Sequence, residues 1–162
     1  MLHDIEELEA DIPPEALAVL ADARDAYSER GKAEAALHAA LELAPDNLAL
    51  RVAAYKFFFY ANRLDQALPH AEACLAMAGD ALALPRNWCV VTSDSARFAG
   101  FDRPQRIYLQ SLIAIGYCRA RLGDTESGEA LLRQAARLDP QDRMGAGRLA
   151  DVVARGGIDD EE

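Results

Sequence analysis

Long apolar runs, a basic excess and closely spaced cysteines are all missing from this chain of 162 residues. No apolar run approaches the roughly 20 residues that a membrane-spanning helix needs, so we expect no membrane association. The acidic N-terminus lacks the basic and apolar regions of a signal peptide, which predicts a cytoplasmic protein. Acids outnumber Lys and Arg by 27 to 17, and no basic face emerges, so we expect no nucleic-acid binding.

Cysteine and histidine are too scarce to indicate a metal site or a disulfide framework. The three cysteines, Cys74, Cys89 and Cys118, are scattered and fit a reducing compartment. His70 and Cys74 are four residues apart on one predicted helix, a spacing that can present two ligands to a metal ion. No further ligand is evident, and Cys74 falls on an apolar face, so we expect packing there and no metal or other cofactor.

Catalytic motifs are also missing. No Gly-rich phosphate loop follows a strand, and no paired metal-ligand motif appears. The cysteines have no base adjacent in the sequence, although a remote partner stays open. The sequence therefore favours a protein that is not an enzyme.

The acidic excess is confined to the two ends of the chain. Residues 1–15 hold six acids and no base, the last four residues are all acidic, and residues 16–157 carry 17 of each sign. This pattern predicts an acidic N-terminal segment at 1–13, one domain at 14–157 and an acidic tail at 158–162. Solvated ends are the commoner interpretation, and docking on a basic partner is the alternative.

Alanine, about one residue in five, and other strong helix formers dominate the composition, so the predicted fold class is all-α. High Arg and Ala with only two Lys are typical of a GC-rich bacterial genome. Helical periodicity predicts helices near 14–30, 32–44, 48–62, 65–78, 103–122 and 141–155. Two amphipathic segments also face each other across Leu122-Gly123-Asp124, where Asp124 can cap the second one. Gly116, within the first of them, is tolerable if another helix approaches closely there.

Residues 109–142 carry a family resemblance. The spacing of small and apolar residues there resembles a tetratricopeptide repeat (TPR), a helix-turn-helix unit of about 34 residues; the residues that carry it are Leu112, Ile115, Gly116, Gly123, Leu132, Ala135 and Pro140. Residues 48–81 and 14–47 resemble the same unit, although the second helix of 14–47 is about three residues short. The resemblance implies a right-handed superhelix of antiparallel helix pairs, with about three repeats and a capping helix near 141–155.

The resemblance also implies a concave groove lined by the first helix of each repeat. The residues that map onto it are Val52, Lys56, Phe59, Tyr60, Gln110, Ile113, Tyr117 and Arg121. Known TPR domains that clamp a terminal carboxylate present Lys and Asn at several fixed groove positions, and that pattern is missing here. Residues 57–59 are three consecutive Phe, which cannot share one helical face, so at least one must point away from the main packing stripe.

An insert at about 79–102 interrupts the repeats. It is rich in apolar side chains, namely Trp88, Phe98 and Phe101, and so much apolar surface should not stay in solvent. We expect the insert to fold back over the helices and to fill part of the groove.

The resemblance implies a non-catalytic adaptor or scaffold that binds a peptide or protein partner. The run at 53–75 followed by LPRNW looks like small TPR proteins that accompany bacterial nitrogen-fixation gene sets, which would imply an accessory role in assembling a bacterial complex. One alternative is a structural homo-oligomer, such as a homodimer, that pairs through the groove or an apolar edge. A second alternative is a metal- or cluster-handling accessory protein that uses His70 and Cys74, with Cys89 as a third candidate ligand.

Overall fold

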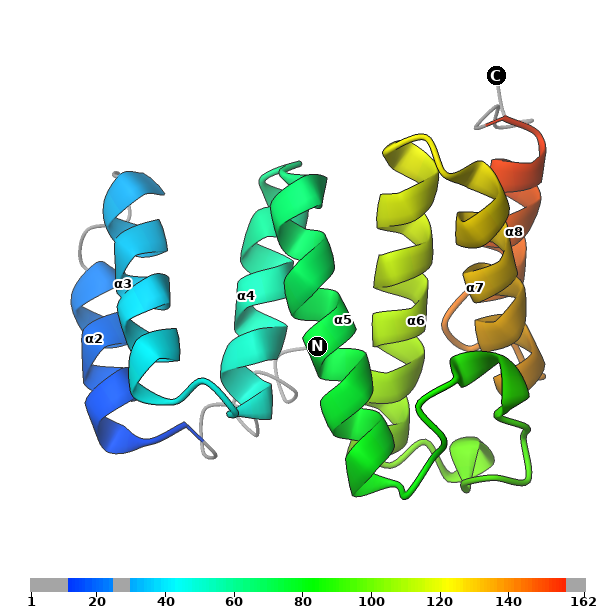
Figure 1. Cartoon of the computed structure of the whole chain (residues 1–162), viewed down its shortest axis with the longest axis horizontal. Helices are drawn as coiled ribbons and strands as arrows, with labels where there is room; N and C mark the ends of the chain where they lie inside the picture. Colours follow the sequence, from blue (N-terminus) through cyan, green and yellow to red (C-terminus); the bar gives the residue numbers. More distant parts are fainter. Residues whose placement is uncertain (1–11, 25–29, 157–162) are drawn as a thin grey trace.

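The structure is a computed structural model that describes residues 12–24 and 30–156 (Figure 1). These residues form helices and turns and no strand, so the all-α prediction is confirmed. The seven α-helices in this part of the chain are α2 (Pro14–Arg24), α3 (Arg30–Leu43), α4 (Leu48–Tyr60), α5 (Leu64–Ala81), α6 (Arg103–Arg121), α7 (Thr125–Leu138) and α8 (Ala146–Ala154). Two 3-10 turns, η1 (Trp88–Val90) and η2 (Phe98–Gly100), lie between α5 and α6.

The helices stand side by side in chain order, from α2 at one end to α8 at the other (Figure 1). Each helix packs against the next one along the chain, and most of these pairs share long faces. The exception is the junction of α3 with α4, where the contact is much smaller. The α2–α3 pair is therefore the least firmly attached part of the described fold.

Three successive helices end in the same way. A residue in the left-handed region follows each of α4, α5 and α6; these residues are Asn62 (φ 58°), Ala83 (φ 55°) and Gly123 (φ 107°). The next amide then donates back to a carbonyl five residues earlier, as in Leu84 N to Gly79 O at 2.8 Å. This is the Schellman arrangement, which satisfies carbonyls that would otherwise be left without a partner at the helix end.

Helices α6 and α7 approach each other at two glycines. A Cβ added to Gly116 would lie 2.9 Å from the carbonyl oxygen of Gly128, and one added to Gly128 would lie 2.6 Å from the carbonyl oxygen of Gly116. This confirms that a neighbouring helix comes close at Gly116, whereas the close approach at Gly128 was not predicted from the sequence. The turn between them is capped as predicted, because Asp124 Oδ1 accepts the amide of Ser127 at 3.2 Å.

Three predicted helix boundaries are wrong. The helix predicted near 14–30 does not reach residue 30, because Arg30 begins α3; residues 25–29 lie outside the described part of the chain. Helix α8 begins at Ala146 instead of 141, because Asp142 and Gly145 take left-handed conformations with φ of 51° and 75°. The loop before α8 is stabilised by the buried Asp139 carboxylate, which accepts the amide of Met144 at 2.9 Å. Helix α5 runs on through the buried Gly79 to Ala81, one turn beyond its predicted end.

The core consists mainly of two apolar clusters. The larger cluster contains residues of α4, α5, α6, α7 and the insert. The other contains mainly residues of α2, α3, α4 and α5. Phe58 is fully buried in the second cluster, whereas Phe57 and Phe59 are only half-buried. The divergence of the three side chains confirms that consecutive Phe residues cannot share one helical face.

The insert folds back against α6 and α7 (Figure 1). Val91 and Phe98 are buried there, and Trp88 is half-buried. The buried amide of Gln134 on α7 ties the insert down, because Nε2 donates to the carbonyls of Trp88 at 2.9 Å and Val91 at 2.6 Å. The expectation that the insert covers part of the helices is thus confirmed.

None of the helices in residues 12–24 and 30–156 combines the length and the apolar character needed to cross a bilayer.

Candidate binding site

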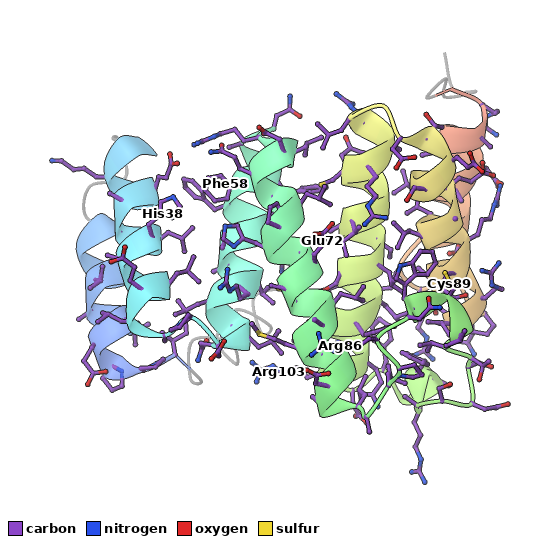
Figure 2. All side chains as sticks on the ribbon, viewed as in Figure 1. His38, Phe58, Glu72, Arg86, Cys89 and Arg103 are labelled. Atoms are coloured by element: carbon purple, nitrogen blue, oxygen red, sulfur yellow. The ribbon has the colours of Figure 1, made fainter. Side chains whose placement is uncertain are left out.

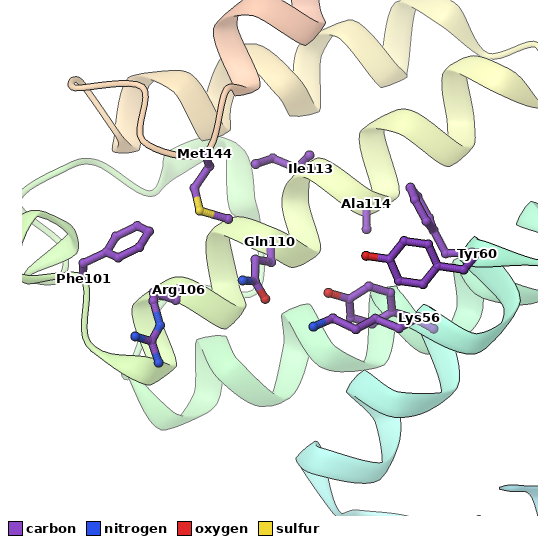
Figure 3. Close-up of a pocket in the computed structure, with 10 residues that line it drawn as sticks. Lys56, Tyr60, Phe101, Arg106, Gln110, Ile113, Ala114 and Met144 are labelled. Atoms are coloured by element: carbon purple, nitrogen blue, oxygen red, sulfur yellow. The ribbon is translucent and has the colours of Figure 1, made fainter. Parts of the chain in front are cut away.

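An open cavity of about 540 Å³ lies between α4 and α6, and we call it the hollow (Figure 3). Both helices pack on α5, and the hollow is the space that remains between their facing stripes. Its lining comes from α4, α6, the end of the insert and the loop before α8: Tyr55, Lys56, Phe59, Tyr60, Phe101, Arg106, Gln110, Ile113, Ala114 and Met144.

Helical periodicity explains which residues reach the hollow. Helix α4 contributes residues at spacings of one, four and five from Tyr55, and α6 contributes residues at four, seven and eight from Arg106. Within each set, residues three or four apart, such as Lys56 with Tyr60 and Gln110 with Ile113, lie on one face of the helix. Two amphipathic stripes, one on each helix, therefore build the two long walls.

Five of the eight residues predicted to line a groove do line the hollow: Lys56, Phe59, Tyr60, Gln110 and Ile113. Val52 does not, since it is 1% exposed and belongs to the core.

Tyr117 and Arg121 lie just beyond the lining. The ring of Tyr117 is 5.2 Å from that of Phe59, and the Arg121 guanidinium carbon is 5.8 Å from the Tyr117 ring centroid. Tyr117 therefore extends the aromatic surface of the hollow along α6, and Arg121 lies next to it.

Of the three insert residues, only Phe101 reaches the hollow. It takes a left-handed conformation with φ of 56°, which is uncommon for a bulky residue. The guanidinium of Arg143 lies over its ring at 5.4 Å. Phe98 instead packs against Tyr108, with ring centroids 5.9 Å apart, and Trp88 packs on the core. The insert thus lines one end of the hollow through Phe101 without filling it, so the expectation that it fills part of the groove is wrong for the hollow.

Four residues that line the hollow were not predicted from the sequence. Tyr55 and Ala114 each neighbour a residue that was predicted, and Arg106 is one helical turn before Gln110, so spacing along the two helices could have found these three. Met144 comes from the loop before α8, and no sequence pattern connects it with α4 or α6.

The polar groups of the hollow are cations and neutral donors. Lys56 and Arg106 are cationic, and the lining contains no Asp or Glu among the residues that the structure describes. Burial raises the pKa of Tyr55, so its phenol stays neutral. In Figure 3 the side chains of Lys56, Tyr60 and Gln110 extend into the same space. An apolar surface with a few donors suits a ligand that brings apolar groups and acceptors.

The His70–Cys74 pair lies on α5, and neither residue lines the hollow. Cys74 is fully buried, and burial raises its pKa to about 12. His70 Nδ1 accepts a hydrogen bond from Arg51 Nη1 at 3.2 Å, and its ring stacks on Phe58 at 5.6 Å. Both side chains are thus engaged in packing and hydrogen bonding.

No group of three His, Cys, Asp or Glu residues that could hold a metal ion occurs in the described segments. The third candidate ligand, Cys89, is exposed and lies beside α7 (Figure 2). The same view shows His38 and Phe58 facing each other between α3 and α4, at a centroid distance of 6.1 Å.

Fold and site define an all-α protein whose successive helices pack side by side and leave an aromatic hollow between α4 and α6. No model of a known protein family matches the chain, and no solved structure matches it. The chain is 38% identical over 135 residues to the "Uncharacterized 19.8 kDa protein in nifW 5'region" of Azotobacter chroococcum mcd 1. The alignment covers 82% of this chain and 75% of the relative, so the chain belongs to the family of that protein.

Proposed function

We propose that this protein is a TPR-type adaptor that binds a peptide or protein partner in the hollow and performs no chemistry of its own. In this proposal the helix pairs form a right-handed superhelix, and the hollow is its concave groove. The observation that carries the proposal is the origin of the lining. Helices α4 and α6, which would be the first helices of the second and third repeats, supply eight of the ten lining residues.

The character of the lining supports binding. Aromatic and aliphatic side chains dominate it, and Tyr60 is 71% exposed at its edge. Tyr side chains in such positions often dominate the binding energy of an interface. A cavity of 540 Å³ also falls within the range of about 300–1,000 Å³ that is usual for ligand pockets.

The polar groups in the hollow support binding over catalysis. They are two cations, two phenols and one amide, and the described lining offers no Ser, Cys, His, Asp or Glu. Binding of a partner needs only such donors and an apolar surface.

The relative supports an accessory role in a bacterial assembly. Its name places it in the 5′ region of nifW, which agrees with the resemblance to proteins that accompany nitrogen-fixation genes. We propose that the partner belongs to the same gene context.

Quantitative co-purification from the native host tests the adaptor proposal. Tyr60→Ala removes an exposed aromatic ring from the hollow and should leave the fold intact. Leu43→Ala is the matched control, because Leu43 is 57% exposed on α3 and lies outside the lining. We expect Tyr60→Ala to lower recovery of a specific partner by about fivefold or more and Leu43→Ala to leave it unchanged.

Equal recovery with all three proteins would count against the hollow as the binding site. Light scattering of the same samples addresses the homo-oligomer alternative. A dimer that Tyr60→Ala dissociates would favour self-association through the hollow over an adaptor role.

A further inference from the structure

We propose that the partner segment bound in the hollow presents a bulky apolar side chain next to an Asp or Glu. This inference rests on the proposed function, because it specifies the ligand of the same site. It follows from the charges of the lining, the direction of its hydrogen-bond donors and the apolar surface at the end that Phe101 lines.

Cations stand on both long walls of the hollow. Lys56 comes from α4 and Arg106 from α6, and no carboxylate belongs to the described lining. The lining therefore favours an acidic ligand and disfavours a basic one, whose charges would meet like charges.

The neutral polar groups of the lining point to the same ligand. The Gln110 amide and the hydroxyls of Tyr55 and Tyr60 can all donate hydrogen bonds. Lys56, Tyr60 and Gln110 extend into the same space in Figure 3, so a carboxylate there can accept from more than one of them. Hydrogen bonds to an ionised acceptor are stronger than those between neutral groups. An uncharged apolar segment would leave the Lys56 ammonium desolvated without a partner.

The apolar anchor fits the end of the hollow that Phe101 lines. Phe101, Ile113 and Met144 supply apolar surface there, and Phe101 does so from a left-handed backbone conformation. Such a conformation is disfavoured for a bulky residue and persists where the surrounding structure holds it. Phe101 is thus a wall at this end of the hollow, against which an anchor side chain can pack.

Selection of random linear peptides displayed against the full-length chain tests this inference. We expect enriched peptides to pair Asp or Glu with Phe, Trp, Tyr or Leu, and to bind less tightly as salt rises. Replacing their acids by Lys should weaken binding to the wild-type chain by about tenfold or more.

Charge reversal in the protein provides the matched test. Lys56→Glu should lower the affinity for the acidic peptides by about tenfold and raise the affinity for their Lys counterparts. Arg148→Glu, at an exposed position of α8 outside the lining, should change neither affinity. Lys56→Gln gives the same loss for acidic peptides without adding a negative charge. Circular dichroism of each variant checks that the helices are retained.

The outcomes separate this inference from the adaptor proposal. Peptides that need Tyr60 but show no preference for acids, or no response to Lys56→Glu, overturn the acidic ligand and leave binding in the hollow intact. Peptides that ignore both Tyr60→Ala and Lys56→Glu overturn both proposals. Enrichment of basic peptides, or of none, also overturns the inference.

Discussion

Replacing Gly128 by Ala should loosen the α6–α7 pair, which approaches closely at Gly116 and Gly128. The new Cβ would lie 2.6 Å from Gly116 O, 2.8 Å from Ala120 Cβ and 2.9 Å from Ala120 N. Two of these neighbours are backbone atoms, so no side chain can rotate away, and the helices must separate.

The size of the effect is the difference between two opposing contributions. Overpacking a tight contact costs about 1–3 kcal/mol, and backbone neighbours favour the upper end of that range. Replacing Gly by Ala within a helix recovers about 1 kcal/mol. We expect Gly128→Ala to lower the free energy of unfolding by about 2 kcal/mol, which corresponds to a fall in Tm of about 4–8 °C in a chain of this size. Thermal melting followed by circular dichroism measures it.

Gly31→Ala is the matched control for this experiment. Gly31 lies in the first turn of α3 with no heavy atom within 4 Å of an added Cβ. The same substitution there should raise Tm or leave it unchanged, because only the gain in helix propensity remains. The reasoning is refuted if Gly128→Ala melts at or above the wild-type temperature, since the helices would then tolerate the Cβ.

Three further predictions concern the insert, pH dependence and thiol reactivity. Gln134→Glu removes the amide that donates to two insert carbonyls, which should lower the free energy of unfolding by about 1–3 kcal/mol. Trypsin should then cleave faster at Arg86 in the insert, and unchanged cleavage would show that Gln134 does not hold the insert in place. Burial, followed by nearby Arg51 and His38, lowers the pKa of His70 below its ordinary 6.5. The unfolded chain therefore binds this proton more readily, so the free energy of unfolding should fall as pH drops below about 6.5. His70→Gln should flatten that part of the Tm–pH curve, and an unchanged curve would show that His70 is not the group responsible. A thiol reagent should modify exposed Cys89 first and reach Cys74, whose pKa burial raises to about 12, only after unfolding; rapid labelling of Cys74 in the folded chain would show that it is not buried.

Local chemistry allowed most of the helices to be predicted. The spacing of apolar residues located six of the α-helices from α2 to α7, and the turn at Leu122-Gly123-Asp124 has the predicted cap. Such features depend on residues within one or two turns of each other, so the sequence alone contains them. The predicted α8 began too early, because the pattern of apolar residues reaches back to Met144. In the structure the buried Asp139 carboxylate and the left-handed Asp142 form a loop there instead.

The candidate site was predicted in part. Five of the eight proposed groove residues line the hollow, because a helical face can be extrapolated from the sequence once one position is assigned. The prediction for Val52 was wrong because the same face of α4 also packs on α5 and α6. Packing buries Val52 and leaves other residues of that face accessible.

The sequence by itself determined the all-α class, the approximate helices and the charge balance of residues 16–157, because these depend on local spacing and composition. Only the tertiary structure decided that Phe101 and Met144 meet Lys56 and Gln110 around one hollow. It also decided that Gly128 must be small, since the constraint comes from Gly116 on the neighbouring helix. Contacts between residues distant in the chain depend on how the helices pack, and a single sequence does not display that packing.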